Sequence, residues 1–261
     1  MDSQKVTVVV LIDFSNAFNT VDHEILLSIL ARYRFSPLAL CWFSSYLRGR
    51  QQSVRFGNKS SEWADLKAGV PQGGILSPLL FSLFINSISF SLNCSYHLYA
   101  DDLQLYVQSP VEELDITISK INSNLQAISE WSAKYGITVN PAKCQAMLMG
   151  GARMLAKIDI SNLPQIVYNG KVIPLFDSIK NLGLLIDPTL SWRPHICEVS
   201  RKVVGSLQSL YRLKNFLPLK IKIQLINTLV LPIIDYADIC YSDLSEELLN
   251  KLERLLNNCI R

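Results

Sequence analysis

Residues 96–107 read YHLYADDLQLYV, and this stretch decides the fold. Apolar and polar side chains alternate on both sides of Asp101 and Asp102, which predicts two short strands that meet at a tight turn. Adjacent carboxylates at such a turn repel each other, and burial raises their pKa values unless a cation lies between them. The pattern therefore predicts a Mg²⁺ site that serves phosphate chemistry. A solvated turn is the structural alternative, because Asp is a favoured turn residue.

The composition is typical of a globular chain. With 261 residues, 49% hydrophobic and 18% charged, it can bury a core as one large domain or two smaller ones. The longest apolar runs, 6–12 and 75–85, are too short or too interrupted to cross a bilayer, and the N-terminus does not resemble a signal peptide. The six cysteines show no zinc-site spacing, so we interpret them as reduced thiols of an intracellular protein, in the nucleus or the cytoplasm.

The net charge is only +3, but two windows of the chain contain basic residues and no acid. The first, residues 25–61, contains Arg32, Arg34, Arg48, Arg50, Arg55 and Lys59. The second, residues 199–234, contains Arg201, Lys202, Arg212, Lys214, Lys220 and Lys222. Basic windows on both sides of an acidic centre favour a nucleic-acid groove with a metal site at its floor. Ordinary solvated faces would produce the same windows.

Residues 5–12 read KVTVVVLI, which predicts a central strand buried on both faces. The strand ends at Asp13, where a rigid support could present a carboxylate to a metal, although a strand-end Asp is also often a simple cap. Farther along, Asp22 is the predicted N-cap of a helix. We interpret His23 as a residue of the helix start, because no second His or Cys accompanies it as a metal ligand.

A Gly-rich loop precedes an apolar helix in residues 69–88, GVPQGGILSPLLFSLFINSI. Glycines in the loop let the backbone approach a ligand closely, and Gln72 offers an amide that can hydrogen-bond a sugar or a base. Ser77-Pro78 starts the helix. Alone, such a loop is a weak signal. Before it, residues 52–58, QSVRFGN, predict a hairpin closed by Gly57-Asn58.

The second half of the chain alternates helical and strand-like segments. Ser109 and Glu112 match a capping box that opens a long helix with a core-facing apolar stripe, and Gly136 ends it. Lys143 lies at an element boundary before the strand-like residues 145–149.

The C-terminal region is expected to be helical. Residues 157–186 predict short strands and turns, and from Arg193 onward leucines recur at helical spacing. Tyr236-Ala237-Asp238 repeats part of the central motif, but its neighbours follow helical spacing. We therefore interpret it as part of a helix in the C-terminal bundle.

Taken together, these motifs resemble the successive palm motifs of reverse transcriptases. In order, they are LIDFSNAFNTVDH (11–23), GVPQGGILSPLLF (69–81), YADD (99–102), NPAKCQAMLMG (140–150) and NLGLLID (181–187). The tail LVLPIIDYADICYSDL (229–244) is similar to that of jockey-like, LINE-type non-LTR retrotransposons. A lone YADD is a weak signal, whereas five motifs in register are a strong one.

The resemblance implies roles in a two-metal reaction. Asp13 and Asp101 resemble the two principal Mg²⁺ ligands, with Asp102 as an accessory carboxylate and the Phe14 carbonyl as a backbone ligand; Mn²⁺ can stand in for Mg²⁺. Two metals about 3.5–4 Å apart would activate the primer 3′-hydroxyl and stabilise the leaving pyrophosphate. Lys143 matches the lysine that protonates pyrophosphate.

The resemblance also implies how the substrates bind. Phe18 resembles a steric gate, whose ring leaves no room for a 2′-hydroxyl and so selects dNTPs. Gln72 would contact the nucleotide, and Gly73 and Gly74 would allow its close approach. Leu182 and Gly183 belong to a hairpin that holds the primer end. The basic residues of the second window, Arg201, Lys202, Arg212, Lys214, Lys220 and Lys222, would contact the phosphates of an RNA template and a DNA primer.

The implied fold class is α+β. Residues 1–192 would form a right-hand polymerase palm, an antiparallel sheet packed on helices, with partial fingers. Residues 193–261 would form a helical thumb-like region. The chain departs from the family pattern at Asn19, where Asp is frequent, and at Gly74, where Ser is frequent.

Two functional classes remain open. The first is an RNA-directed DNA polymerase domain of a retrotransposon, in which the three carboxylates and Phe18 are retained. The second is a non-catalytic, nucleic-acid-binding remnant of such a protein. The chain begins at the first catalytic strand, without the upstream basic residues that grip a triphosphate and without a recognisable endonuclease segment. We therefore expect fingers and endonuclease segments of a longer parent protein as partners.

Overall fold

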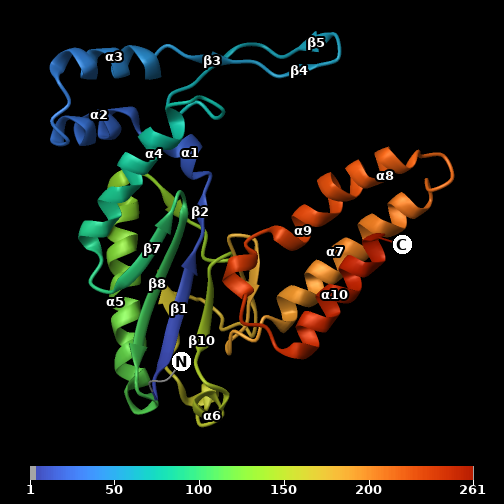
Figure 1. Cartoon of the computed structure of the whole chain (residues 1–261). Coiled ribbons are helices and arrows are strands. Elements are labelled where there is room, and N and C mark those ends of the chain that lie inside the picture. The colour runs from blue at the N-terminus through green and yellow to red at the C-terminus, as the bar shows by residue number, and fades with distance from the viewer. Residues whose placement is uncertain (1–3, 261) are drawn as a thin grey trace.

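The computed structural model describes residues 4–260, and its centre is a four-stranded antiparallel sheet with strand order β10-β1-β8-β7 (Figure 1). The four strands are β1 (Val6–Ile12), β7 (Ser95–Tyr99), β8 (Asp102–Ser109) and β10 (Gln145–Met149). β1 pairs with both β10 and β8, so it is central, as predicted. The predicted α+β class is confirmed: the sheet is antiparallel and helices pack against it.

Burial along β1 differs from the prediction. Val6, Val8 and Val10 are completely buried, whereas the residues between them are partly exposed. The strand therefore has one fully buried face rather than two. The reason is that the helices lie mainly on one side of the sheet (Figure 1), as is common for antiparallel sheets.

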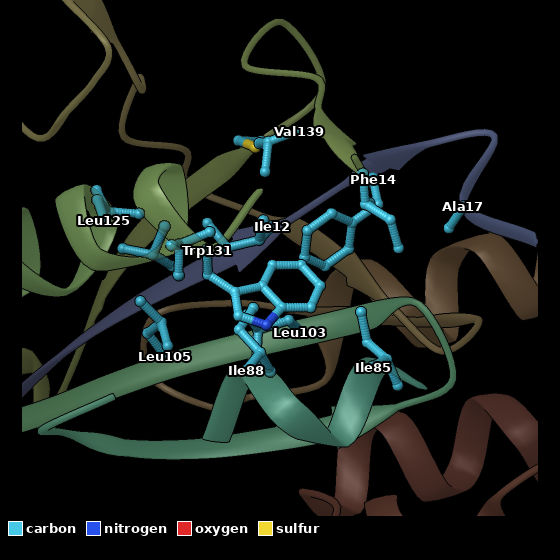
Figure 2. Close-up of a cluster of buried hydrophobic side chains, with 14 of the residues drawn as sticks. Ile12, Phe14, Ala17, Ile85, Ile88, Leu103, Leu105, Leu125, Trp131 and Val139 are labelled. Carbon is cyan, nitrogen blue, oxygen red and sulfur yellow. The ribbon is translucent and has the colours of Figure 1, made fainter. Parts of the chain in front are cut away.

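Two helices, α4 (Ser77–Ile85) and α5 (Leu114–Tyr135), supply most of the apolar side chains that cover this face. Figure 2 shows the centre of this core, where Trp131 of α5 lies among Ile12, Ile88 and Leu103. The ring of Phe14 meets Trp131 edge-on at a centroid distance of 6.1 Å. The end of β1 is thus anchored in the largest buried cluster of the described chain.

Several predicted helix boundaries are confirmed. The helix α2 (His23–Arg32) is capped by Asp22, whose carboxylate accepts a hydrogen bond from the Ile25 amide at 2.9 Å. His23 begins this helix, and its Nε2 donates to the Gly69 carbonyl at 2.8 Å. At the end of α5, Gly136 adopts φ 73°, the left-handed conformation that favours glycine at helix ends.

The capping box at Ser109 is not formed. Ser109 is the last residue of β8 and pairs with Val6. Its hydroxyl is buried and has no hydrogen-bond partner among residues 4–260. A 3₁₀ turn, Val111–Glu113, follows, and α5 begins only at Leu114. Pairing with β1 fixed the strand end, and this overrode the local capping signal.

Residues between α2 and α4 form an arm that extends away from the four-stranded sheet (Figure 1). It contains α3 (Pro37–Leu47), β3 (Gln51–Gln52), β4 (Arg55–Phe56), β5 (Lys59–Ser60) and β6 (Ala64–Asp65). β4 and β5 pair around Gly57-Asn58, which confirms the predicted hairpin.

The remaining short elements lie between β1 and α2, between α5 and β10, and between β10 and the C-terminal helices. They are α1 (Ala17–Thr20), β2 (Phe14–Ser15), β9 (Thr138–Val139), α6 (Ala152–Leu155), β11 (Val167–Tyr168), β12 (Lys171–Val172), β13 (Ile179–Asn181) and β14 (Leu184–Ile186).

The C-terminal region is helical, as predicted. It contains α7 (Arg193–Tyr211), α8 (Leu219–Leu225), α9 (Leu231–Asp235) and α10 (Glu246–Ile260). Tyr236 and Ala237 are not helical, contrary to the prediction, because α9 ends at Asp235 and Ala237 adopts φ 55°, whereas Asp238 begins a short 3₁₀ helix, Asp238–Tyr241. Among residues 4–260 no helix is both long enough and apolar enough to cross a membrane.

The cap of α2 provides a stability prediction. Asp22→Ala should lower the free energy of unfolding by about 1 kcal/mol, because the Ile25 amide loses its acceptor. Asp22→Asn retains an acceptor and is the matched control, with a loss of less than half of that. Urea unfolding measures both. Equal losses for the two variants would contradict the capping interpretation.

Candidate active site

The register between β1 and β8 brings two predicted metal ligands together. Ile12 pairs with Leu103, so the next pair outward places Asp13 level with Asp102. Side chains of directly opposed residues lie on the same face of a sheet. Asp13 and Asp102 therefore lie side by side, although they are 89 positions apart in the sequence.

Asp101 lies in the two-residue turn that joins β7 and β8. Tyr99 pairs with Asp102 across this turn. Ala100 adopts φ 51°, a left-handed conformation that costs a non-glycine residue about 1–2 kcal/mol. Such strain is retained where the surrounding structure fixes a functional conformation. The YADD motif thus forms the strand–turn–strand unit that the sequence predicts.

The surroundings of Asp13 are formed by the segment before β10. The Asp13 carbonyl accepts a hydrogen bond from the Asn140 amide at 2.8 Å. Its amide donates to Cys144 Sγ at 3.5 Å. Lys143 places its Nζ 3.8 Å from Asp13 Oδ2. Because Lys143 is largely exposed, this pair contributes little to stability, but it places a mobile cation beside the carboxylates.

Two features of these carboxylates fit a divalent cation. Asp13 Oδ2 is buried and accepts no hydrogen bond from residues 4–260. Burial raises the pKa of Asp102, and the nearby charges of Asp101 and Asp13 raise it further. Carboxylate oxygens are the ligands that Mg²⁺ prefers. Among the described residues, no group of three acidic, His or Cys side chains lies close enough together to hold a metal ion.

Phe14 and Phe18 lie on either side of the turn after Asp13. The Phe14 ring is buried. Asp13 and Asn140 form a hydrogen-bonded pair, and in an antiparallel ladder such pairs alternate with pairs that are not hydrogen-bonded. The next pair is Phe14–Val139, so the Phe14 carbonyl points away from β9. Phe18 is partly buried and stacks on Phe81 of α4, with ring centroids 4.1 Å apart. Phe18 therefore has a rigid ring with one face supported.

The GVPQGG loop is joined to the segment that carries Phe18. The Val70 amide donates to the Phe18 carbonyl at 2.9 Å. Gly69 adopts φ 90°, and a Cβ there would lie 2.8 Å from the Asn19 carbonyl oxygen, so only glycine permits this approach. Gln72 Nε2 donates to the side-chain oxygen of Asn19 at 3.0 Å.

This contact is one that sequence reasoning missed. Asn19 was notable only as a departure from the family pattern, yet it holds the amide of Gln72. Gly73 adopts φ 82°, and a Cβ at Gly74 would lie 3.0 Å from Ser77 Oγ. The backbone conformation at position 73 therefore favours glycine, and a side chain at position 74 would crowd the Ser77 hydroxyl.

The hairpin β13–β14 is linked to β8 by a hydrogen bond. Gln104, two residues beyond Asp102 on β8, donates from Nε2 to Asn181 Oδ1 at 2.7 Å. Leu182 and Gly183 form the turn, with φ 44° and 88°. No signal in the sequence indicates that Gln104 and Asn181 are partners, because both are ordinary polar residues on short strands.

The basic residues of the C-terminal helices differ in their surroundings. Arg201 and Lys202 both pair with Glu198, at 2.8 and 3.7 Å. These cations lower the pKa of Glu198 to about 2. Lys214 contacts the Tyr211 hydroxyl at 2.5 Å. Of the others, Arg212 and Lys220 are exposed and Lys222 is half-buried, and none of the three forms an ion pair within residues 4–260.

Comparisons with known proteins agree with this geometry. The family model "Reverse transcriptase (RNA-dependent DNA polymerase)" matches residues 1–186. The RNA-directed DNA polymerase from mobile element jockey of Drosophila funebris is 28% identical over 263 residues, which cover 96% of this chain and 27% of that protein. The probable RNA-directed DNA polymerase from transposon BS of Drosophila melanogaster is 28% identical over 218 residues, or 79% of this chain and 23% of that protein.

Among solved structures, apo telomerase from Candida tropicalis, truncated from its C-terminal domain, matches with a TM-score of 0.48 and 15% identity over 71% of this chain and 35% of that one. The chain spans about a quarter of the length of its curated relatives. Since the family model covers well over half of the residues and includes the segments around Asp13, Gln72 and Asp101, the chain belongs to the reverse transcriptase family and is similar to its jockey-like, non-LTR retrotransposon members.

Proposed function

We propose that this chain is the palm and thumb-like region of an RNA-directed DNA polymerase, which adds dNTPs to a primer 3′-hydroxyl along an RNA template. The observation that carries the proposal is the register of β1 and β8, whose last pair, Ile12–Leu103, brings Asp13 and Asp102 to the same end of the sheet, where Asp13 Oδ2 is buried and accepts no hydrogen bond from residues 4–260. Lys143 Nζ lies 3.8 Å from Asp13 Oδ2, and Phe18, five positions after Asp13, is held by its stack on Phe81.

Members of this family depend on divalent metal ions. We assign Mg²⁺ as the ion, two per site, with Mn²⁺ as a substitute, because all the candidate ligands are oxygens. Asp13, Asp101, Asp102 and the Phe14 carbonyl would hold them. When bound, such ions act as Lewis acids that lower the pKa of a hydroxyl nucleophile and neutralise charge on phosphate oxygens.

The residues of the chain provide the rest of the reaction. Lys143 carries an ammonium group that can donate a proton to the departing pyrophosphate. The ring of Phe18, fixed by its stack on Phe81, occupies the space below the sugar and excludes a 2′-hydroxyl. Gln72, oriented by Asn19, offers its side-chain oxygen to the nucleotide, and the backbone of Gly73 and Gly74 permits close approach.

The nucleic acid would lie between the carboxylates and the C-terminal helices. Leu182 and Gly183 would contact the primer end. The basic residues of α7 and α8, with the intervening loop, would contact phosphates, which requires charge and no base readout. We take residues 1–192 as palm with partial fingers and 193–261 as the thumb-like part. In the cell, nucleus or cytoplasm, fingers and endonuclease segments of a longer protein would complete the machinery.

The alternative is a non-catalytic remnant that binds nucleic acid. The two functions separate in a single experiment, primer extension on poly(rA)/oligo(dT), because a remnant binds the duplex without extending it.

The carboxylates give the first activity prediction. Asp13→Asn or Asp101→Asn should lower Mg²⁺-dependent extension of poly(rA)/oligo(dT) by at least about a hundredfold, because each removes a charge worth several kcal/mol of transition-state stabilisation. Asp177→Asn, at an exposed loop position, is the matched control. Extension that survives both active-site substitutions would exclude the assigned metal site.

Phe18 gives a prediction of sugar selection. Phe18→Ala opens the space below the sugar, so incorporation of rNTPs relative to dNTPs should rise about tenfold to a hundredfold. Phe18→Tyr retains a ring and should keep the wild-type ratio. Steady-state kcat/KM values for rGTP and dGTP on the same primer measure it. An unchanged ratio in Phe18→Ala would return this ring to a purely structural role beside Phe81.

The basic surface gives a prediction about salt. On an RNA–DNA duplex, replacing Lys220 and Lys222 by Ala should flatten the log–log dependence of affinity on salt by about two units, because two phosphate contacts are lost. The comparison pair is Arg201→Ala with Lys202→Ala, whose charges Glu198 already balances in part, so the slope should change less. A wild-type slope for the Lys220/Lys222 variant would remove α8 from the duplex-binding surface.

A further inference from the structure

Tyr236 belongs to the near-repeat of the central motif that the proposed function leaves unused. Its hydroxyl donates a hydrogen bond to the Leu182 carbonyl at 2.8 Å. Its ring covers Gly183, where a Cβ would lie 3.0 Å from Tyr236 Cε1. A residue of the C-terminal region thus closes over both residues of the β13–β14 turn.

The backbone around Tyr236 directs its side chain toward this turn. α9 ends one residue earlier, Tyr236 is in a non-helical conformation with ψ 111°, and Ala237 adopts φ 55°. Five residues on, the buried Tyr241 donates to the Ile234 carbonyl and fixes the same bend. Tyr241 shares a buried cluster with Leu184 of β14. The bend and the hairpin therefore pack as one unit.

The turn itself carries strain. A two-residue hairpin turn with positive φ at both positions favours Asn-Gly, whereas here Leu182 occupies the first position at φ 44°. A left-handed leucine costs about 1–2 kcal/mol. Its side chain is 42% exposed, so core packing does not account for its presence. The hydrogen bond from Tyr236 to the carbonyl of this same residue stabilises the strained conformation.

The hairpin is held at a second point by the catalytic strand. Gln104 of β8 donates to Asn181, the residue before the turn. Gln104 is two residues from Asp102, so a displacement of the turn would be resisted from the catalytic side and from the C-terminal helices. The turn is therefore linked to β8 through Asn181 and to the C-terminal region through Tyr236.

We propose that Tyr236 is a positioning residue, which locks the Leu182-Gly183 turn against the C-terminal helices and thereby sets where the 3′ end of a bound primer lies relative to Asp13 and Asp102. This inference rests on the proposed polymerase function. Tyr236 does not touch the reacting atoms. It acts through the turn, so its loss should disturb the primer terminus more than overall duplex affinity, which phosphate contacts along the helices provide.

The test uses the full chain with Tyr236→Phe, which removes only the hydroxyl. Amide hydrogen exchange in residues 181–185 should become about fivefold to tenfold faster, as expected for the loss of one hydrogen bond. An RNA–DNA duplex with 2-aminopurine at the primer 3′ terminus reports the terminal base. The fluorescence change on binding should shrink, while the Kd for the duplex stays within about twofold and first-nucleotide addition slows about fivefold to tenfold.

Tyr33→Phe is the matched control. Tyr33 is also partly exposed, and its hydroxyl accepts a hydrogen bond from Asn86 at 3.2 Å, away from the hairpin. It should leave all four measurements at wild-type values. A double-mutant cycle adds a second test, in which Gly183→Ala should cost less first-nucleotide addition in a Tyr236→Ala background than in wild type. The backbone strain that alanine introduces at position 183 is the same in both backgrounds. The difference between the two losses in first-nucleotide addition therefore measures the contact with the Tyr236 ring.

These measurements test the positioning role of Tyr236 separately from the polymerase function. Unchanged hydrogen exchange in Tyr236→Phe would show that the Tyr236 hydroxyl does not hold the Leu182-Gly183 turn in place, which would overturn the proposal. Faster exchange with an unchanged 2-aminopurine signal would overturn the positioning role. If wild type extends no primer, the proposed polymerase function fails, while hydrogen exchange and fluorescence still decide on Tyr236.

Discussion

Electrostatic repulsion between Asp13 and Asp102 is the constraint on which the rest of this structure depends. The antiparallel register of β1 and β8 forces these carboxylates together at one end of the sheet, and Asp101 adds a third charge nearby. An arrangement that raises the pKa of Asp102 is unfavourable for a chain without a bound cation. The Lys143 ammonium, 3.8 Å from Asp13 Oδ2, offsets part of this repulsion, and metal ions bound as proposed would offset more of it.

The surrounding contacts are arranged to hold this unfavourable site in place. Buried valines fix β1, the Phe14 ring is held against Trp131, and the segment before β10 binds the backbone of Asp13 on both sides. Two left-handed non-glycine residues, Ala100 and Leu182, lie in turns that carry the YADD and NLGLLID motifs. Strain at these positions is tolerated because the rest of the fold over-determines the turns.

Predictions from local sequence were confirmed where a conformation depends only on residues within one element. The cap at Asp22, the end of α5 at Gly136 and the hairpin at Gly57-Asn58 each depend on conformations within a few residues, and all three are confirmed. The signals failed where a partner element intervened. Ser109 was drawn into the β1–β8 ladder and lost its capping role. Ala237 left the helical pattern, in a bend that Tyr241 fixes from farther along the chain.

By itself, the sequence determined the identity of the chemical groups and their order, because the residue types and their neighbours in Asp13, Phe18, Gln72, Asp101 and Lys143 are local properties. It also contained the motifs whose resemblance to reverse transcriptases implied the α+β class. Only the tertiary structure decided which groups meet. The Gln72–Asn19, Gln104–Asn181 and Tyr236–Leu182 contacts each join residues more than fifty positions apart. Such pairs leave no periodic signal, since their distance depends on how the sheet, the loop and the helices pack.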